Sequence, residues 1–280
     1  MSWRFSMASD IGGRKEQQDC IEILSSDADD SHLIIVADGM GGHKGGALAA
    51  RTVIETARER FNNDRGPDPQ EFLNELCLES HHAISALVGD EARSPGSTCV
   101  FLYLDGSEAY WAHVGDSRLY HFQNGELLYR TQDHSVVQLM MDRGDIRESD
   151  VADSGIQNQL YMCLGGSTVP EPGHDAYAVE ETELFMLCSD GFWSYVEPEE
   201  VAECMKEQSL EEGSAEHLVE LAKERGGCDG DNISLALICW TPEKDFCIKQ
   251  LFERLYTYLV SNVRRDLWST RLRYPFQSKS

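Results

Sequence analysis

Long apolar runs are absent from this chain of 280 residues. Nowhere do about eighteen apolar residues occur in succession, so the sequence predicts no membrane-spanning helix. The N-terminal segment MSWRFSMASD also lacks the apolar stretch of a signal peptide. We therefore expect a soluble protein of the cytoplasm.

Basic residues are few: 24 lysines and arginines stand against 49 aspartates and glutamates, which gives a net charge of −25. Non-specific nucleic-acid binding requires a basic surface that neutralises phosphates. Anionic membranes likewise repel an acidic body. The composition therefore argues against a nucleic-acid partner and against membrane contact. We expect a monomer with a mostly solvated acidic surface.

Paired cysteines are also missing. The nine cysteines are scattered, with no C-x-x-C pair and no cysteine–histidine spacing typical of zinc sites. Several lie in or beside apolar runs, where a free thiol behaves as a small hydrophobic side chain. This usage favours a reducing compartment.

What the chain does contain is four aspartates at the ends of apolar runs. Asp38 follows LIIVA, Asp116 lies in VGDSR, Asp190 follows LFMLCS, and Asp231 precedes NISLALIC. Such runs are typical of buried strands, so each carboxylate lies where the core meets solvent. Converging carboxylates repel each other unless cations lie between them. Oxygen ligands without a histidine or cysteine cluster favour Mg²⁺ or Mn²⁺ over zinc. The pattern predicts a metal-dependent hydrolase, although each aspartate alone could simply begin a turn.

The first half of the chain predicts strands and then two helices. Short strands are expected near residues 3–8, 20–25 and 32–37. Glycines from residue 41 open a helix that runs to about Asn62 with one apolar stripe. A second helix begins at Asp68-Pro69, where aspartate caps the helix and proline occupies its first position.

The second half begins with a run of strands. These are expected at residues 97–104, 107–114, 117–122 and 126–131, with Asp105-Gly106 and Asn124-Gly125 as hairpin turns. The remaining elements are a short helix at 135–143, an irregular stretch at 144–175, strands at 176–180, 183–189 and 232–240, and helices at 198–207 and 214–225. Hairpin-linked strands with segregated helices indicate an α+β fold, in which two antiparallel sheets pack face to face with helices outside.

Eight motifs occur in order along residues 5–240. They are R-x-x-x-x-D (Arg14 to Asp19), ADGMGGH (37–43), GSTCV (96–100), VGDSRLY (114–120), TQDHS (131–135), LGG (164–166), SDGFW (189–193) and DNIS (231–234). Together they resemble the metal-dependent protein phosphatases, the type 2C serine/threonine phosphatases, in a bacterial form. The four-layer α-β-β-α sandwich of that family agrees with the elements expected above.

The resemblance implies a centre that holds two Mn²⁺ or Mg²⁺ ions. Asp38 would bridge the two ions, the carbonyl of Gly39 would complete the shell of one, and Asp190 and Asp231 would hold the other. Two ions that share a water lower its pKa and prepare it to attack phosphorus. Asp116 matches the residue that, with Asp190, holds a weaker third ion in bacterial relatives.

Three further positions near the N-terminus match functional residues of the family. Asp19 matches an acidic residue near the metals, and Arg14 matches the residue that contacts substrate phosphate, to which a guanidinium can donate two hydrogen bonds. His43 is the candidate acid for the leaving group, with simple loop hydrogen bonding as the alternative. The sequence departs from the family at Gln17, where asparagine is usual, and the role of this side chain stays open.

Two histidines and one long segment also correspond to parts of the family pattern. His113 and His134 lie inside motifs, but a structural hydrogen-bonding role is expected for both. Residues 136–163 correspond to the family's variable flap beside the active site.

The resemblance ends near Trp240, which divides the chain into a catalytic domain at 1–240 and an extension at 241–280. Apolar residues at helical spacing between Ile248 and Val263 predict an amphipathic helix, followed by a disordered tail. The helix could pack on the acidic catalytic body, bind a partner, or contact a membrane through its basic charge, in that order of preference.

The sequence thus predicts a phosphatase that hydrolyses phosphoserine and phosphothreonine in proteins and opposes a serine/threonine kinase. No cysteine is followed six residues later by an arginine, so the loop of cysteine-dependent phosphatases is absent from the sequence. Two alternatives remain open: a scaffold that keeps the fold without turnover, and a phosphohydrolase of small molecules. The sequence names neither the substrate protein nor the kinase.

Overall fold

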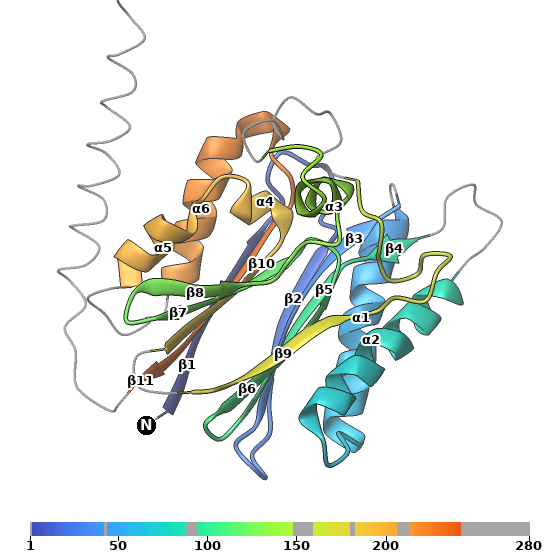
Figure 1. The fold of residues 1–280 in the computed structure, drawn as a ribbon, viewed down its shortest axis with the longest axis vertical. Helices are drawn as coiled ribbons and strands as arrows, with labels where there is room; N and C mark the ends of the chain where they lie inside the picture. Colours follow the sequence, from blue (N-terminus) through green and yellow to red (C-terminus); the bar gives the residue numbers. More distant parts are fainter. Residues whose placement is uncertain are drawn as a thin grey trace, which may run out of the picture.

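The computed structural model describes residues 2–41, 44–87, 95–147, 159–179, 183–205 and 213–241. Within these ranges two antiparallel sheets pack face to face, and helices cover the outer face of each sheet (Figure 1). The predicted four-layer α+β sandwich is therefore confirmed.

The first sheet is five-stranded in the described part of the chain. Its order is β1 (Ser2–Asp10), β11 (Ile233–Thr241), β10 (Glu183–Cys188), β7 (Arg118–Gln123) and β8 (Glu126–Arg130). The N-terminal strand β1 lies at one edge of this sheet and pairs antiparallel with β11, the last strand in the described part of the chain. The turn between β7 and β8 contains Asn124 and Gly125, both at positive φ, as the predicted Asn-Gly hairpin requires.

The second sheet combines strands from the first part of the chain with the later strand β9. Its order is β2 (Asp19–Ser25), β3 (His32–Met40), β5 (Cys99–Asp105), β6 (Glu108–Val114) and β9 (Gly173–Ala178), with β4 (Gly96–Ser97) paired to the end of β3. The chain passes from this sheet to the first one between β6 and β7.

Helices α1 (Lys44–Asn63) and α2 (Pro69–Ser85) pack on the second sheet, while α4 (Asp190–Trp193), α5 (Pro198–Met205) and α6 (Ser214–Gly226) pack on the first (Figure 1). The short helix α3 (Val136–Asp142) follows β8. The side chain of Asp68 accepts hydrogen bonds from the backbone of Gln70 and Glu71, so the predicted cap of α2 is confirmed.

The core has three apolar layers because side chains of a strand alternate between its two faces. In β3, Leu33 and Ile35 contact the layer under α1 and α2, whereas Ile34 and Val36 lie between the sheets. The third layer lies between the first sheet and its own helices. The central strands β3, β5 and β10 are therefore buried on both faces, which explains their continuous apolar runs in the sequence.

Three features of the fold differ from the sequence-based expectation: one strand is interrupted, another begins earlier, and one helical turn was not predicted. The strand predicted at 97–104 is interrupted at Thr98, whose backbone N–H donates to the carbonyl of Asp38 instead. Strand β9 begins at Gly173, inside the stretch expected to be irregular. The single turn α4 was not predicted, because four residues are too few to show helical periodicity.

No helix in the described ranges is long and apolar enough to span a bilayer. The predicted C-terminal helix and most of the central part of the flap lie outside the described residues, so the division of the chain at Trp240 stays a prediction.

Candidate metal centre

Strand pairing brings the predicted aspartates to one end of the sandwich. Asp19 lies directly opposite Asp38 in the β2–β3 ladder. Strand β10 ends where β11 begins, which places Asp190 and Asp231 at the same edge of the first sheet. Asp116 lies in the crossover from β6 to β7, two residues before a β7 residue that pairs with the last residue of β10.

The electrostatics show that these carboxylates are close neighbours. Burial and then the charge of Asp190 raise the pKa of Asp116 to about 7. Burial, followed by repulsion from Asp190 and Asp231, raises the pKa of Asp19 to about 7. The pKa of Asp190 rises to about 6 through burial and the charge of Asp231. Asp38 is influenced by all four of the others, and burial raises its pKa well above the ordinary value. The cluster therefore concentrates negative charge, of which Arg14 offsets only a part through its contact with Asp231.

The donor set suits a hard divalent cation. Oxygen Oδ1 of Asp190 is buried without a hydrogen-bond partner, a costly arrangement in the absence of a positively charged ligand. Within the described ranges, no three acidic, histidine or cysteine side chains already surround one point closely enough to hold an ion. The buried oxygen and the convergence of carboxylates still fit Mg²⁺ or Mn²⁺, which accept carboxylate, carbonyl and water oxygens together.

Backbone contacts hold Asp38 at the end of β3. Its N–H donates to Thr98 Oγ1 at 3.0 Å, and its carbonyl accepts from the N–H of Thr98 at 2.8 Å and from Ser97 Oγ at 3.0 Å. The Thr98 hydroxyl also bonds to Ser117 Oγ at 2.7 Å. This hydroxyl therefore connects Asp38 to the segment that carries Asp116.

Glycine is required at position 39 because no side chain fits there. A Cβ would lie 2.1 Å from the carbonyl oxygen of Gly46 and 2.8 Å from that of Gln18. A Cβ at Gly46 would in turn lie 2.6 Å from the Gly39 carbonyl oxygen. Two facing glycines thus allow the start of α1 to approach the candidate carbonyl ligand closely.

Asn232 organises the loop between β1 and β2, a role that sequence reasoning missed. Its Oδ1 accepts from the N–H of Gln18 at 2.8 Å, and its Nδ2 donates to the carbonyls of Ile11 at 2.9 Å and Glu16 at 3.1 Å. This loop carries Arg14 and leads into β2. The sequence signal that could have indicated this role is the position of Asn232 directly after the predicted ligand Asp231, within the motif DNIS.

Ser189 and Ser234 form a second supporting pair. Ser189 Oγ donates to Asp19 Oδ2 at 2.7 Å, and the N–H of Ser234 donates to the same hydroxyl at 3.0 Å. Both serines are buried. They therefore join the second sheet, through Asp19, to the two strands of the first sheet that flank Asp190.

Arg14 contacts the predicted ligand Asp231, while its role toward substrate phosphate stays a prediction. Its Nη2 donates to Asp231 Oδ2 at 2.5 Å, and its side chain is 57% exposed. A guanidinium has five N–H donors, so an exposed arginine here can bond both a carboxylate and an incoming oxyanion. Gln17 stabilises the same loop, because its Nε2 donates to Ser9 Oγ at 2.7 Å and to the carbonyl of Asp10 at 3.2 Å.

The structure describes two of the three histidines for which the sequence predicts a role. His43, the candidate acid, lies outside the described residues and stays a prediction. His113 Nε2 is 2.8 Å from the carbonyl of Gln132, and His134 Nδ1 accepts from the N–H of Gly115 at 3.1 Å. These backbone bonds are those expected of structural histidines.

Comparison with known proteins agrees with this geometry. The family model described as "Protein phosphatase 2C" matches residues 9–223. A protein phosphatase 2C-type protein of Streptococcus pyogenes is 30% identical over 241 residues, which cover 84% of this chain and 96% of that protein. The chain belongs to the protein phosphatase 2C family. Like the relatives that bear this activity in their names, it is a serine/threonine protein phosphatase and therefore a hydrolase.

Solved structures of bacterial relatives have the same fold. The serine/threonine phosphatase of Streptococcus agalactiae superposes with a TM-score of 0.77 at 28% identity, covering 86% of this chain and 100% of that one. The catalytic domain of PstP, crystallised in complex with two manganese ions, superposes with a TM-score of 0.73 at 28% identity, covering 86% and 99%.

Proposed function

We propose that this phosphatase hydrolyses phosphoserine and phosphothreonine in proteins by means of water activated between two Mn²⁺ or Mg²⁺ ions. The observation that supports the proposal best is the convergence of five aspartates from both sheets, with the buried Oδ1 of Asp190 lacking a partner. The two manganese ions of the PstP catalytic domain are consistent with it.

Asp38, the backbone carbonyl of Gly39, Asp190 and Asp231 would together hold the two cations. The chemistry that such cations would supply is Lewis-acid activation of a water for attack on phosphorus.

The remaining residues act on the substrate or on the edge of the centre. Arg14 is placed to bond two oxygens of the phosphate, which orients the phosphorus and offsets charge that develops during attack. Asp19 supports the centre through Ser189. Asp116 and Asp190 would hold a third, weaker cation. His43 remains our candidate for protonating the leaving alkoxide.

The proposed substrates are phosphorylated proteins, and the phosphatase would oppose a serine/threonine kinase. A scaffold without turnover is disfavoured because the predicted metal aspartates are all present. A small-molecule phosphohydrolase differs only in its substrate.

Phosphate release measured with Mn²⁺ separates the three possibilities. The proposal predicts release from a phosphothreonine peptide, loss of release with chelator, and rescue by added Mn²⁺. Metal-loaded protein that hydrolyses neither peptide nor small phosphomonoesters would indicate the scaffold. Hydrolysis of the small esters alone would indicate the third alternative.

A further inference from the structure

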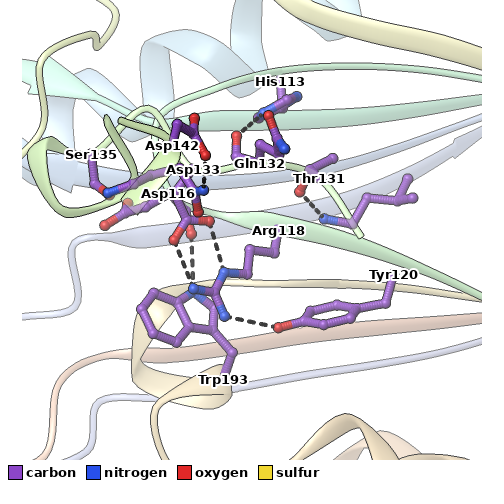
Figure 2. Close-up of polar contacts among 12 residues, drawn as sticks. His113, Asp116, Arg118, Tyr120, Thr131, Gln132, Asp133, Ser135, Asp142 and Trp193 are labelled. Carbon is purple, nitrogen blue, oxygen red and sulfur yellow. Dashed lines mark hydrogen bonds and ion pairs between the residues drawn. The ribbon is translucent and has the colours of Figure 1, made fainter. Parts of the chain in front are cut away.

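A buried arginine–aspartate pair lies beside the metal centre and takes no part in the mechanism above. Arg118, the first residue of β7, donates from Nε to Asp133 Oδ1 at 2.8 Å and from Nη2 to Asp133 Oδ2 at 2.7 Å (Figure 2). The two side chains are only 13% and 9% exposed. A desolvated guanidinium requires such a partner, so the two-point contact fixes the plane of the Arg118 head group.

That plane lies against an indole ring. The Cζ atom of Arg118 is 3.5 Å from the ring centroid of Trp193, a cation–π contact in a largely buried setting. Arg118 Nη1 also donates to the hydroxyl of Tyr120 at 3.1 Å, on the side away from Asp116 (Figure 2). Asp133 thus orients the guanidinium, and the guanidinium orients the indole. We call Arg118, Asp133 and Trp193 the arginine clamp.

The indole connects two segments that carry candidate ligands. Trp193 Nε1 donates to the backbone carbonyl of Asp116 at 2.9 Å. Trp193 is also the last residue of α4, the single turn that begins with Asp190. The turn is closed by a bond from the N–H of Ser194 to the carbonyl of Asp190 at 3.0 Å. The Trp193 side chain therefore links the backbone of Asp116 to the turn that begins with Asp190.

The crossover that contains Asp116 connects strands of different sheets, and hydrogen bonds to Thr98 and His134 hold the residues on either side of Asp116. Gly115 has φ of +106°, and a Cβ there would lie 2.6 Å from Thr98 Cγ2. The segment that contains Asp133 also holds this glycine, since the N–H of His134 donates to the Gly115 carbonyl at 2.9 Å. Asp133 and His134 thus hold the two ends of the crossover, at Arg118 and Gly115, while Trp193 holds Asp116 from α4.

We propose that the arginine clamp is a positioning device that fixes Asp116 relative to Asp190 and thereby sets the affinity of the cation that these two carboxylates share. This inference rests on the proposed function. The clamp residues touch neither phosphate nor water in the proposed mechanism. They act through the backbone of Asp116 and the turn of Asp190, as supporting residues around metal ligands commonly do.

Two conservative substitutions distinguish positioning from simple stability. Trp193→Phe keeps an aromatic ring under Arg118 but deletes the N–H that donates to Asp116. Tyr120→Phe deletes one hydrogen bond to the same guanidinium without touching Asp116, and serves as the matched control. Arg118→Lys keeps the charge but loses the two-point contact, and provides a second test if Trp193→Phe does not fold.

Manganese binding is measured by isothermal titration calorimetry and, separately, as the Mn²⁺ dependence of phosphate release from a phosphothreonine peptide. We expect Trp193→Phe and Arg118→Lys to weaken the weakest Mn²⁺ site about tenfold, while turnover at saturating Mn²⁺ is largely restored. Tyr120→Phe should bind Mn²⁺ as the wild type does, even if its melting temperature falls equally.

The outcomes separate this inference from the proposed function. Unchanged Mn²⁺ affinity in the folded Trp193→Phe or Arg118→Lys variants would overturn the clamp, as would an equal loss in Tyr120→Phe. A wild-type protein that binds no Mn²⁺ would overturn the proposed function and the clamp together.

Discussion

Strand β10 separates two buried carboxylate sites of opposite character. At its start, Glu183 is fully buried and both of its oxygens have partners: Oε2 contacts the His121 imidazole, and Oε1 accepts from Gln123 Nε2 at 2.9 Å. Just past its end, Asp190 has a buried oxygen without a partner, and burial and the charge of Asp231 raise its pKa more than Arg14 lowers it. The same strand positions both carboxylates, but the protein provides partners for both side-chain oxygens only at Glu183.

The difference indicates which site is structural and which is built for a ligand. A buried carboxylate that the protein itself satisfies contributes to the native state, and losing a partner destabilises it. Several carboxylates that raise one another's pKa lower stability at neutral pH until a cation joins them. Substitutions at the two ends of β10 should therefore have opposite effects on stability and activity.

The largest effect is expected from Asp190→Asn. The substitution keeps the shape of the side chain but removes a metal ligand, so kcat/KM should fall about a thousandfold or more. The fold should persist, because the amide removes charge from a repulsive cluster. Mn²⁺-dependent hydrolysis of a phosphothreonine peptide and far-UV circular dichroism test both parts. Retention of more than a tenth of wild-type turnover would count against the assignment.

At the other end of the strand, Glu183→Ala should act on stability alone. It leaves His121 and Gln123 without their buried partner and should reduce the free energy of unfolding by about 3–5 kcal/mol, as measured in urea. The folded fraction should have the kcat of the wild type. A variant that keeps its stability but loses kcat would reverse the distinction between the two sites.

A smaller effect is expected at the exposed edge of the aspartate cluster. Arg14→Ala removes a charged donor to phosphate and should lower kcat/KM by about 10- to 150-fold, because a hydrogen bond to a charged group contributes about 1.5–3 kcal/mol. Arg14→Lys, the control, should lose less, since it keeps the charge. Steady-state kinetics at saturating Mn²⁺ provide the comparison. Equal activity of Arg14→Ala and the wild type would remove Arg14 from the substrate site.

The smallest effect concerns pH and stability without metal. The folded carboxyls of Asp19, Asp116 and Asp190 have pKa values of about 7, 7 and 6, above the ordinary value of 3.8. The folded state therefore binds more protons than the unfolded state between these limits, so its stability decreases as pH rises through this window. The melting temperature of chelated protein should fall by a few degrees from about pH 5 to about pH 7.5.

Two additions sharpen that measurement. Mn²⁺ should raise the melting temperature more at the higher pH, because the carboxylates are then ionised. Asp38→Asn should flatten the pH dependence of the chelated protein, since it removes the carboxylate that interacts with all the others. A metal-free wild type that becomes more stable across this window would contradict the electrostatic description of the cluster.

Much of the fold could be predicted because a strand that is buried on both faces has a continuous apolar sequence. The runs LIIVA and ISLALIC are apolar on both faces because β3 and β11 each lie between two apolar layers. The hairpin at Asn124-Gly125 and the cap at Asp68 depend on local chemistry, which sequence shows well. The motifs then indicated that the aspartates converge, which no single segment could show.

The supporting contacts could not be predicted because they join residues far apart in the chain. Nothing local in TQDHS indicates that Asp133 binds Arg118, or that Trp193 bonds to the backbone of Asp116. The same holds for Asn232, whose side chain fastens a loop more than two hundred residues earlier. These pairings depend on the crossing of β6 to β7 and on the turn α4, which lack a periodic signal.

The most direct test is to locate manganese in crystals of the wild-type protein by anomalous scattering. The proposed function predicts two Mn²⁺ peaks bridged by the carboxylate of Asp38, with the Gly39 carbonyl at one ion and Asp190 and Asp231 at the other. Crystals grown with excess Mn²⁺ that show no metal among these residues would contradict it.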